Sequence, residues 1–255
     1  MARQADPVIE FRDVSYRLPN GREILHALDL EARSGEILVL LGRSGSGKTT
    51  ALKLVNRLLE TSAGNLLIEA RVARQWDTIK LRRHIGYAIQ EVGLFPHYTI
   101  ARNIGLVPSI ERWPASRIHV RVQELLKLVG LNPDIGSRYP HELSGGQRQR
   151  VGVARALAAD PPILLMDEPF GALDPLTRSD LQREFLSLQE QLGKTVLFVT
   201  HDLHEALLLG SRIALLEEGR LVSIGSPQEF LNSADPLVQK YVHAFSGAEQ
   251  ARGGK

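Results

Sequence analysis

The sequence predicts an α/β fold with a parallel core sheet, an N-terminal antiparallel β subdomain and an inserted α-helical subdomain. From residue 162 onward, short apolar segments alternate with helical ones, which is typical of a parallel sheet covered on both faces. Residues 8–32 instead alternate polar and apolar side chains, and residues 91–159 are mostly helical in pattern. We therefore expect a single domain over residues 1–240 and a short flexible tail over residues 241–255.

The N-terminal elements follow from alternation and turn residues. Residues 8–16 and 24–32 alternate, and Pro-Asn-Gly at 19–21 favours a turn between them, so we expect a β-hairpin. The compact apolar segment 36–41 is predicted to be a buried strand that runs into glycines and a helix. Further strands are expected near 65–69 and 84–90.

In the second half, helix and strand patterns are regular. Residues 117–130 carry apolar side chains at helical spacing and end on Gly130, a suitable C-cap. The following elements are then expected in order: strand 162–168, helix 176–193, strand 195–201, helix 203–210 and strand 212–218.

Composition excludes several classes of protein. The 255 residues include 31 basic and 29 acidic side chains, a net charge of +2, without a long basic run, so we expect no nucleic-acid partner. There is no cysteine, which excludes disulfides and thiolate metal sites and fits a reducing cytoplasm. The start lacks the apolar core of a secretory signal, and the longest apolar runs are far shorter than the roughly 20 residues that span a bilayer. Any action at a membrane would therefore require a partner.

Residues 42–49, GRSGSGKT, match G-x-x-x-x-G-K-[ST] between a buried strand and a helix. Such glycines let backbone N–H groups point at phosphate oxygens, Lys48 reaches the β- and γ-phosphates, and the Thr49 hydroxyl ligates Mg²⁺. This predicts a P-loop NTPase (RecA-like) core; the alternative is a glycine-rich turn that matches by chance. The residues expected to bind nucleotide here are Gly42, Arg43, Ser44, Gly45, Ser46, Gly47, Lys48, Thr49 and Thr50.

Two acids end the apolar segment ILLMDE. Asp167 ends this strand at the sheet edge where α/β folds bind ligands, and we expect it to hold Mg²⁺ through water. Glu168, the next residue, is placed to polarise an attacking water as general base. Two adjacent acids favour hydrolysis over simple nucleotide binding, and the alternative is a strand end with two solvated carboxylates.

LSGGQ, residues 143–147, resembles a second anion site. A helix is expected to begin at Ser144, Gly145, Gly146 and Gln147. No lysine or metal ligand accompanies them, so this anion site is incomplete by itself. The alternative is an N-cap whose glycines serve tight packing.

With this motif ahead of ILLMDEP, the chain resembles ABC transporter ATPase subunits over about residues 8–235. The resemblance implies a head-to-tail dimer, formed with a second copy or a paralogous ATPase subunit. In such a dimer the signature LSGGQ of one subunit caps the γ-phosphate of ATP held by the other.

The resemblance also assigns individual residues. Tyr16 matches the aromatic side chain that stacks on adenine, or is a core residue of the hairpin. Gln90 matches the glutamine near Mg²⁺ and the attacking water, and His201 matches the histidine that contacts the γ-phosphate; each is otherwise an ordinary strand end. Asp174, in GALD at 171–174, matches the acid that contacts the opposite subunit, or belongs to a structural turn.

The loop after Gln90 presents Leu94, Phe95, Pro96 and Tyr98 together. We interpret segment 90–98 as a surface that receives transmembrane permease subunits, the alternative being internal packing. Segments 85–108 and 138–178 are similar to ATPase subunits that import glycine betaine, carnitine and choline.

These resemblances imply an ATP- and Mg²⁺-dependent ATPase that powers an osmoprotectant importer. It would lie peripherally on the cytoplasmic face of the plasma membrane and serve a solute-binding protein indirectly. The alternatives are an importer of another small polar solute such as an amino acid, a soluble ABC ATPase acting on nucleic acid or the ribosome, and a binding module without catalysis.

The sequence departs from the family pattern in two places. Many relatives continue into a paired regulatory module, whereas this sequence stops soon after KYVHAF, so we do not expect regulation by that route. Around Ala70 the glycine usual at the hairpin is missing, so we expect a different turn there.

Overall fold

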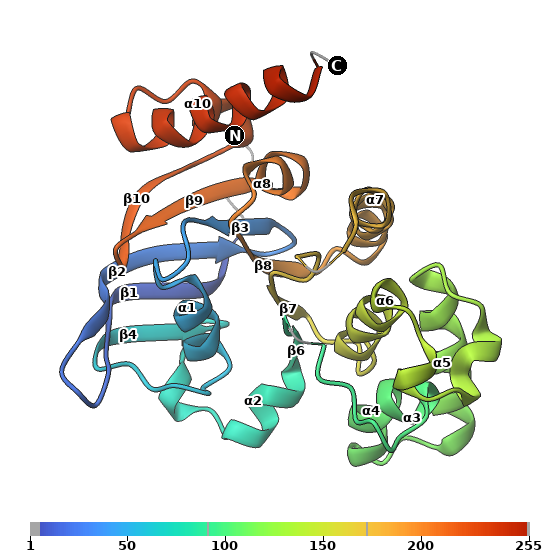
Figure 1. Cartoon of the computed structure of the whole chain (residues 1–255). Coiled ribbons are helices and arrows are strands. Elements are labelled where there is room, and N and C mark those ends of the chain that lie inside the picture. Colours follow the sequence, from blue (N-terminus) through green and yellow to red (C-terminus); the bar gives the residue numbers. More distant parts are fainter. Residues whose placement is uncertain (1–5, 91, 172, 254–255) are drawn as a thin grey trace. The chain divides into compact units, whose positions relative to one another are not determined.

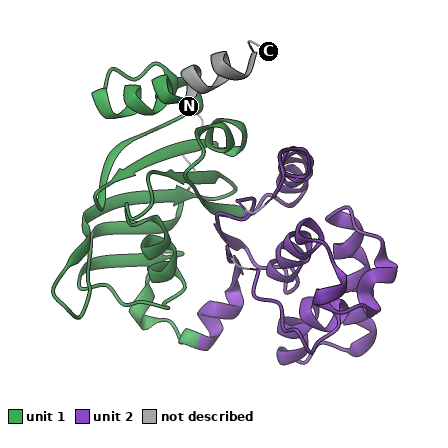
Figure 2. Cartoon of the chain, in the orientation of Figure 1, with its two compact units in different colours: residues 1–78, 195–255 green, residues 79–194 purple. Residues whose placement is uncertain are grey.

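A computed structural model describes residues 6–90, 92–171 and 173–253 of the chain. They form two compact units, one of Met1–Thr78 with Thr195–Lys255 and one of Ile79–Lys194 (Figure 2). Glu91 of the predicted docking loop, Ala172 of GALD and the last two residues of the expected tail lie outside the described residues.

The predicted N-terminal hairpin is confirmed, as part of an antiparallel sheet in the first unit (Figure 1). One face of its first strand covers the core: Ile9 and Phe11 are buried on one side of an irregularity in the strand, and Val14 and Tyr16 are buried beyond it, so the alternation shifts by one residue between Phe11 and Val14. The strand order is β2-β1-β4-β5, with β1 (Pro7–Arg17), β2 (Glu23–Arg33), β4 (Ala63–Ile68) and β5 (Arg71–Val72).

Four further strands of the first unit form the sheet that leads to the phosphate loop. β3 (Ile37–Leu41) lies between β8 (Thr195–Thr200) and β9 (Arg212–Glu217) and pairs in parallel with both. Every residue of β3 and β8 is buried, which explains their continuous apolar sequences.

The end of the first unit differs most from expectation. β10 (Arg220–Gly225) adds an antiparallel edge to β9, and its half-exposed, mixed sequence RLVSIG gave no strand signal. The predicted tail boundary between residues 240 and 241 falls within a helix, α10. The helices of this unit are α1 (Lys48–Val55), the 3₁₀ turn η1 (Ala73–Gln75), α8 (Leu203–Leu209), α9 (Pro227–Leu231) and α10 (Pro236–Gly253).

The second unit pairs β6 (Ile85–Ala88) in parallel with β7 (Ile163–Asp167) and contains the predicted helical region. Gly130 at φ 66° and Gly193 at φ 58° follow the ends of α5 and α7, where the left-handed conformation stops a helix. The helices are α2 (Thr78–His84), α3 (Ile100–Ile104), α4 (Leu106–Ile110), α5 (Ala115–Leu128), η2 (Pro133–Ser137), η3 (Pro140–Glu142), α6 (Gly145–Ala156) and α7 (Pro175–Leu192).

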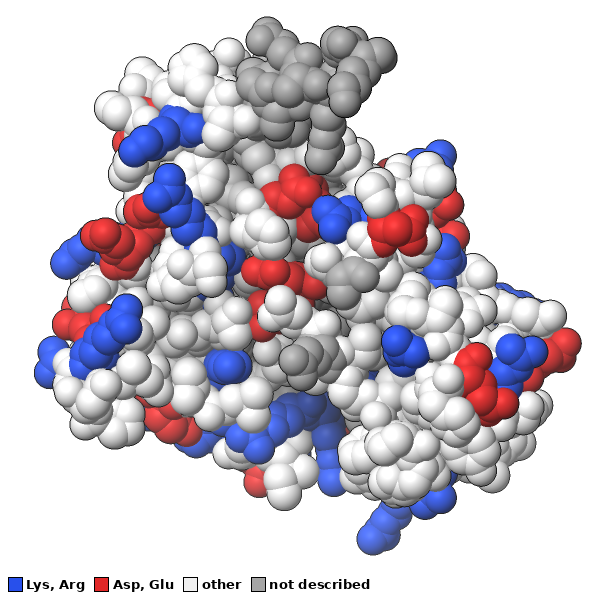
Figure 3. Space-filling view, in the orientation of Figure 1, with Lys and Arg blue, Asp and Glu red and all other residues white. Residues whose placement is uncertain are grey.

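The surface carries both signs of charge. Lys and Arg side chains are interspersed with Asp and Glu over most of the face in Figure 3. Within the described part of the chain, no helix combines the length and apolar character needed to cross a bilayer.

The turn between β4 and β5 is tight although it lacks glycine. Glu69 and Ala70 join Ile68 to Arg71 and adopt φ values of 51° and 60°. Two central residues at positive φ are the pattern of a type I′ hairpin turn, in which L side chains other than Asn and Asp are disfavoured. The missing glycine near Ala70 therefore changes the residue type at this turn but not the positive φ that the turn requires.

We predict that Ala70→Gly stabilises the protein by about 0.5–1 kcal/mol, because glycine adopts positive φ without a steric cost. Urea unfolding of both proteins measures the difference in free energy. Gly193 already has positive φ, so Gly193→Ala is the matched reverse substitution and should destabilise. Equal or lower stability of Ala70→Gly would contradict a strained turn.

Candidate functional site

The phosphate loop begins where buried β3 ends, and α1 begins at Lys48. Gly45 and Gly47 have φ values of 83° and 101°, which L side chains rarely adopt. Positive φ at these two positions turns the chain into α1, which begins directly after Gly47.

Two glycines also permit close backbone packing. A Cβ atom on Gly42 would lie 2.3 Å from the carbonyl oxygen of Leu216 in β9, and one on Gly47 would lie 2.6 Å from Cδ2 of Leu25 in β2. At Gly42 the neighbour is backbone, so a larger residue would require the loop or β9 to move, whereas at Gly47 the Leu25 side chain would have to shift. The spacing of glycines in the motif therefore follows from packing as well as from phosphate geometry.

Lys48 is buried, and its ammonium group donates to the carbonyl oxygens of Gly42 and Arg43, both at 2.8 Å. Ser46 Oγ is also buried and has no hydrogen-bond partner among the described residues. A buried cation and an unsatisfied hydroxyl in a glycine cradle fit an anionic ligand such as a nucleotide phosphate. Thr49 and Thr50 follow, half-buried, in the first turn of α1.

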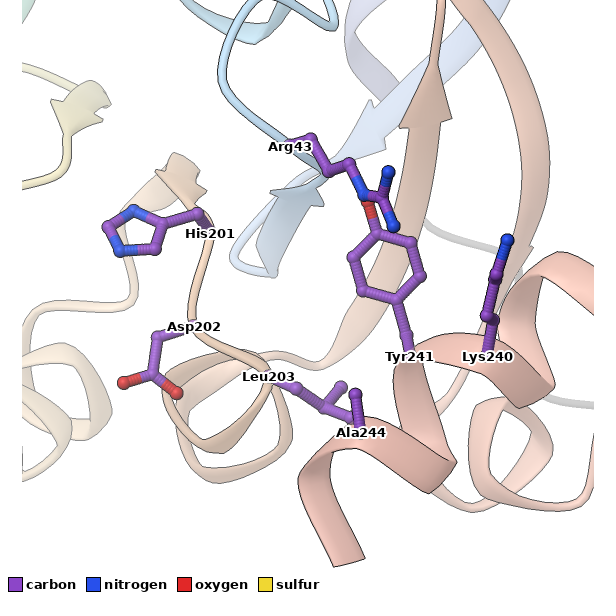
Figure 4. A pocket seen from close by; sticks show the side chains of 7 residues that line it. All are labelled: Arg43, His201, Asp202, Leu203, Lys240, Tyr241 and Ala244. Carbon is purple, nitrogen blue, oxygen red and sulfur yellow. The ribbon is translucent and has the colours of Figure 1, made fainter. Parts of the chain in front are cut away.

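His201 and Arg43 line one pocket of about 380 Å³ in the first unit (Figure 4). His201 is exposed and follows β8, and the next residue, Asp202, caps α8 by accepting from the N–H of His204 at 2.8 Å. The structure thus brings the predicted γ-phosphate histidine to the phosphate loop.

Tyr16 is 9% exposed and lies opposite Leu25 across the hairpin. This burial fits the alternative of a hairpin core residue. Stacking on adenine stays a prediction.

In the second unit, Asp167 ends buried β7 and accepts a hydrogen bond from the Tyr87 hydroxyl on β6. The strand register places Tyr87 opposite Leu165, so Tyr87 and Asp167 are diagonal neighbours on one face of the strand pair. Burial and the adjacent Asp167 carboxylate raise the pKa of Tyr87 well above its usual value. The hydroxyl therefore stays protonated and holds the carboxylate of Asp167 in one orientation.

Glu168 is half-buried and has a φ of 44°. A glutamate in the left-handed region costs about 1–2 kcal/mol, and such residues are enriched at functional sites. Gln90 is exposed, two residues beyond the end of β6, and Asp167 and Glu168 lie at the corresponding end of β7. These three side chains therefore share one edge of the strand pair.

Among the described residues, no group of three or more His, Asp or Glu side chains could hold a metal by itself. Mg²⁺ in phosphate-transferring sites takes only one or two carboxylates, the remaining ligands being waters and substrate phosphates. A lone, buried and oriented Asp167 fits that donor set.

The signature motif forms the start of α6. Ser144 Oγ accepts from the N–H of Gln147 at 3.2 Å, and Gln147 Oε1 accepts from the N–H of Ser144 at 3.0 Å, a reciprocal capping box. Ser144 and Gly145 are exposed. The N-cap alternative is therefore realised in this structure, and it leaves the first turn open to solvent.

The starts of α6 and α7 pack against each other. A Cβ atom on Gly146 would lie 2.9 Å from Cγ2 of Thr177. Asp174 caps α7 by accepting from the N–H of Thr177 at 3.1 Å, and hydrogen bonds from the side chain and the backbone of Thr177 lower the pKa of its carboxyl. The structure thus brings Asp174 and the signature motif together within the second unit.

The predicted docking loop is held by one buried side chain, Asn103 of α3. Its amide donates to the carbonyl oxygens of Phe95, Tyr98 and Thr99 at 3.0–3.1 Å, and its Oδ1 accepts from the N–H of Phe95 at 2.8 Å. Phe95 is 41% exposed, and the Arg102 guanidinium lies 3.8 Å from the centre of the Tyr98 ring. The loop is therefore fixed in shape and presents an aromatic surface to solvent.

Arg155, near the end of α6, donates to the carbonyl oxygens of Val92 and Gly93 in the same loop, the second at 2.7 Å. Burial lowers the pKa of this guanidinium. Arg155 therefore connects the signature helix to the segment that follows Gln90.

Family comparison agrees with this arrangement. The profile of the ABC transporter family matches residues 25–171, which contain the phosphate loop, the signature motif and both acids. The chain belongs to the ABC transporter family. Its predicted P-loop NTPase core is thereby confirmed.

The similar proteins are ATP-binding components of ABC transporters. A glycine betaine/carnitine/choline transport ATP-binding protein of Bacillus subtilis is 49% identical over 236 residues, which are 92% of this chain and 62% of that relative. A glycine betaine uptake system ATP-binding protein of Escherichia coli is 49% identical over 92% of this chain and 76% of its own. A solved ATP-binding cassette, in a dimeric post-hydrolysis state with ADP and Pi, shares 33% identity and a TM-score of 0.77 over 86% of this chain and 98% of its own.

Three residues that hold parts of the candidate site in place were not predicted from the sequence: Tyr87, Asn103 and Arg155. Tyr87 could have been found from strand register, since it lies opposite Leu165, two residues before Asp167. Asn103 and Arg155 bond to backbone carbonyls, and no sequence pattern indicates such contacts.

We predict that Tyr87→Phe raises the Mg²⁺ concentration needed for half-maximal Mg²⁺-dependent nucleotide binding about tenfold, because the carboxylate of Asp167 loses its orienting partner. Titration of Mg²⁺ into the protein with a fluorescent ATP analogue measures the effect without turnover. Binding in EDTA should be unchanged, and Tyr98→Phe serves as control. An unaltered Mg²⁺ midpoint would show that Tyr87 does not orient Asp167.

Proposed function

We propose that the protein is the ATP-hydrolysing subunit of an ABC importer for quaternary-amine osmoprotectants such as glycine betaine, carnitine and choline. The observation that carries the ATPase is the buried Lys48 beside the unsatisfied Ser46 hydroxyl in the phosphate loop. Identity of 49% to two proteins named for these solutes supports the cargo class.

The phosphate loop binds and orients the nucleotide. Lys48 releases the carbonyl oxygens of Gly42 and Arg43 and turns to the β- and γ-phosphates, and the N–H groups of 43–49 donate to the same phosphates. Mg²⁺, when bound, would neutralise phosphate charge, and Thr49, Gln90 and Asp167 are the residues that we propose would hold it.

Hydrolysis requires a positioned water. Glu168 accepts the proton of this water as general base, while its backbone conformation keeps the carboxylate at the strand end. His201 and the backbone donors stabilise charge on the γ-phosphate as the bond to the leaving group breaks.

Each site is completed by a second subunit, either another copy or a paralogue. The exposed hydroxyl of Ser144 and the N–H groups of Gly145 and Gly146 contact the γ-phosphate held by the partner. Gln147 and Asp174 belong to the same contact surface. The dimeric state of a similar cassette with ADP and Pi supports this arrangement.

Transport requires transmembrane permease subunits, which bind segment 90–98. The exposed Phe95 ring and the Tyr98–Arg102 pair form an apolar and cationic surface suited to a short helix of such a subunit. The protein then works peripherally at the cytoplasmic face of the membrane, and a solute-binding protein acts on it only through the permease.

We predict that Glu168→Gln retains ATP binding but lowers hydrolysis by about 10²–10⁴-fold, because the amide cannot accept the proton of water. The variant should accumulate as an ATP-bound dimer, measured by size-exclusion chromatography with light scattering. Adding Ser144→Arg to this variant should abolish the dimer while the monomer still binds ATP. Normal turnover of Glu168→Gln would exclude this base.

We predict that Phe95→Asp abolishes assembly with the permease, because a carboxylate cannot be buried against an apolar helix. The measurement is copurification of membrane proteins from source cells, and glycine betaine-stimulated ATPase activity of the purified complex in proteoliposomes. Ile110→Asp, at an exposed apolar residue of α4, is the control. Stimulation by an amino acid and not by glycine betaine would support an importer with a different transported solute.

A further inference from the structure

A buried carboxyl group supports the turn that carries His201. Glu205, in the first turn of α8, is 3% exposed, and its Oε2 accepts a hydrogen bond from the Thr200 hydroxyl at 2.6 Å. Glutamate side chains are rarely buried to this degree unless their oxygens have hydrogen-bond partners. This contact attaches the end of β8 to α8 through two side chains.

The Thr200 hydroxyl binds two different partners. It donates to Glu205, and its oxygen accepts from the backbone N–H of Asp202 at 3.0 Å. The second bond closes a turn across His201, because the side-chain oxygen of one residue meets the N–H group two residues later. Since a hydroxyl can otherwise rotate, the Glu205 oxygen fixes the direction from which Thr200 accepts.

Both ends of this turn are anchored. Thr200 is the last residue of β8 and pairs with Leu41, which directly precedes the phosphate loop. Asp202 caps α8, whose Ala206 side chain is fully buried. His201 lies between these anchors and is exposed (Figure 4), so the anchored backbone sets where its imidazole can reach.

We propose that Glu205 and Thr200 are positioning residues for His201. This inference rests on the proposed function, in which His201 stabilises charge on the γ-phosphate. The contacts run from the buried carboxyl group through the Thr200 hydroxyl to the backbone after His201. If one of them is removed, the phosphate loop keeps its own glycine contacts, but the imidazole samples more positions and meets the γ-phosphate less often. Hydrolysis should therefore suffer while nucleotide binding does not.

The test compares two variants of the full chain: Thr200→Val removes the hydroxyl and keeps a similar shape, and Thr200→Ser keeps the hydroxyl. We expect Thr200→Val to lower kcat for ATP about tenfold, because misplacing a group at the reacting phosphate is costly, and Thr200→Ser to restore most of it. The Kd of a fluorescent ADP analogue should change by less than about twofold, because ADP lacks the phosphate that His201 contacts. Hydrogen exchange in NMR should show faster exchange of the Asp202 amide in Thr200→Val.

Three controls separate positioning from stability. Thr195→Val removes another buried hydroxyl of β8 that accepts a backbone N–H, that of Gly35 at 3.1 Å, and kcat should stay unchanged. In a His201→Ala background, Thr200→Val should cause no further loss of kcat, because residues that act through one another are not additive. Glu205→Leu should reproduce Thr200→Val, whereas Glu205→Gln keeps an oxygen acceptor and should lie closer to wild type.

The outcomes separate the two proposals. If wild type neither binds the ADP analogue nor hydrolyses ATP, the proposed function fails, and exchange of the Asp202 amide alone then decides whether the turn is held as inferred. Unaltered Asp202 exchange in Thr200→Val overturns the positioning role. Equal losses of kcat in Thr200→Val and Thr195→Val, or a full further loss in the His201→Ala background, also overturn it, because the effect would then not act through His201.

Discussion

The approach of Gly42 to the carbonyl oxygen of Leu216 sets the position of the whole phosphate loop. Because no side chain separates the loop from β9 at this point, the backbone donors of the loop inherit the rigidity of a buried parallel sheet. Gly47 makes the corresponding contact with β2. The loop is thus held between the parallel strands and the antiparallel hairpin of the first unit, and these contacts fix its shape.

The second unit depends on α6 in a comparable way. The start of α6 carries the signature motif and packs on Thr177, its middle pairs Arg150 with Glu184 of α7 at 2.5 Å, and Arg155 near its end holds the loop after Gln90. One helix therefore connects three segments expected to contact different partners: the opposite subunit, the nucleotide and the permease. A rotation of α6 would have to move all three segments or break these contacts.

Local patterns predicted the parts of this protein that depend on nearest neighbours in sequence. The buried strands β3, β7 and β8 were evident from continuous apolar runs, and the phosphate loop was evident from its glycines, because each of these constraints acts within a few residues. The edge strand β10 was missed because only half of its surface is covered, so its sequence alternates weakly. Tyr16 matched a motif by position, yet its burial depends on Leu25 of the paired strand, which no motif records.

Contacts between distant residues account for the rest. Tyr241 and Arg43 line the same pocket although nearly two hundred residues separate them, and the segment of Tyr241 was interpreted as a tail. Tyr87 and Asn103 were likewise silent until strand register and loop path were known. Residues that orient a functional group are harder to predict than the group itself, because any donor of suitable reach can serve.

The four hydrogen bonds of Asn103 have a consequence for the speed of assembly. A loop that is already ordered has no conformational search to complete during an encounter, so a larger fraction of collisions with a fitting surface can proceed to a complex. The conformational entropy of residues 95–99 is lost when the chain folds, so ordering this loop does not reduce the free energy of each association. Such a surface suits the permease docking that we propose for segment 90–98.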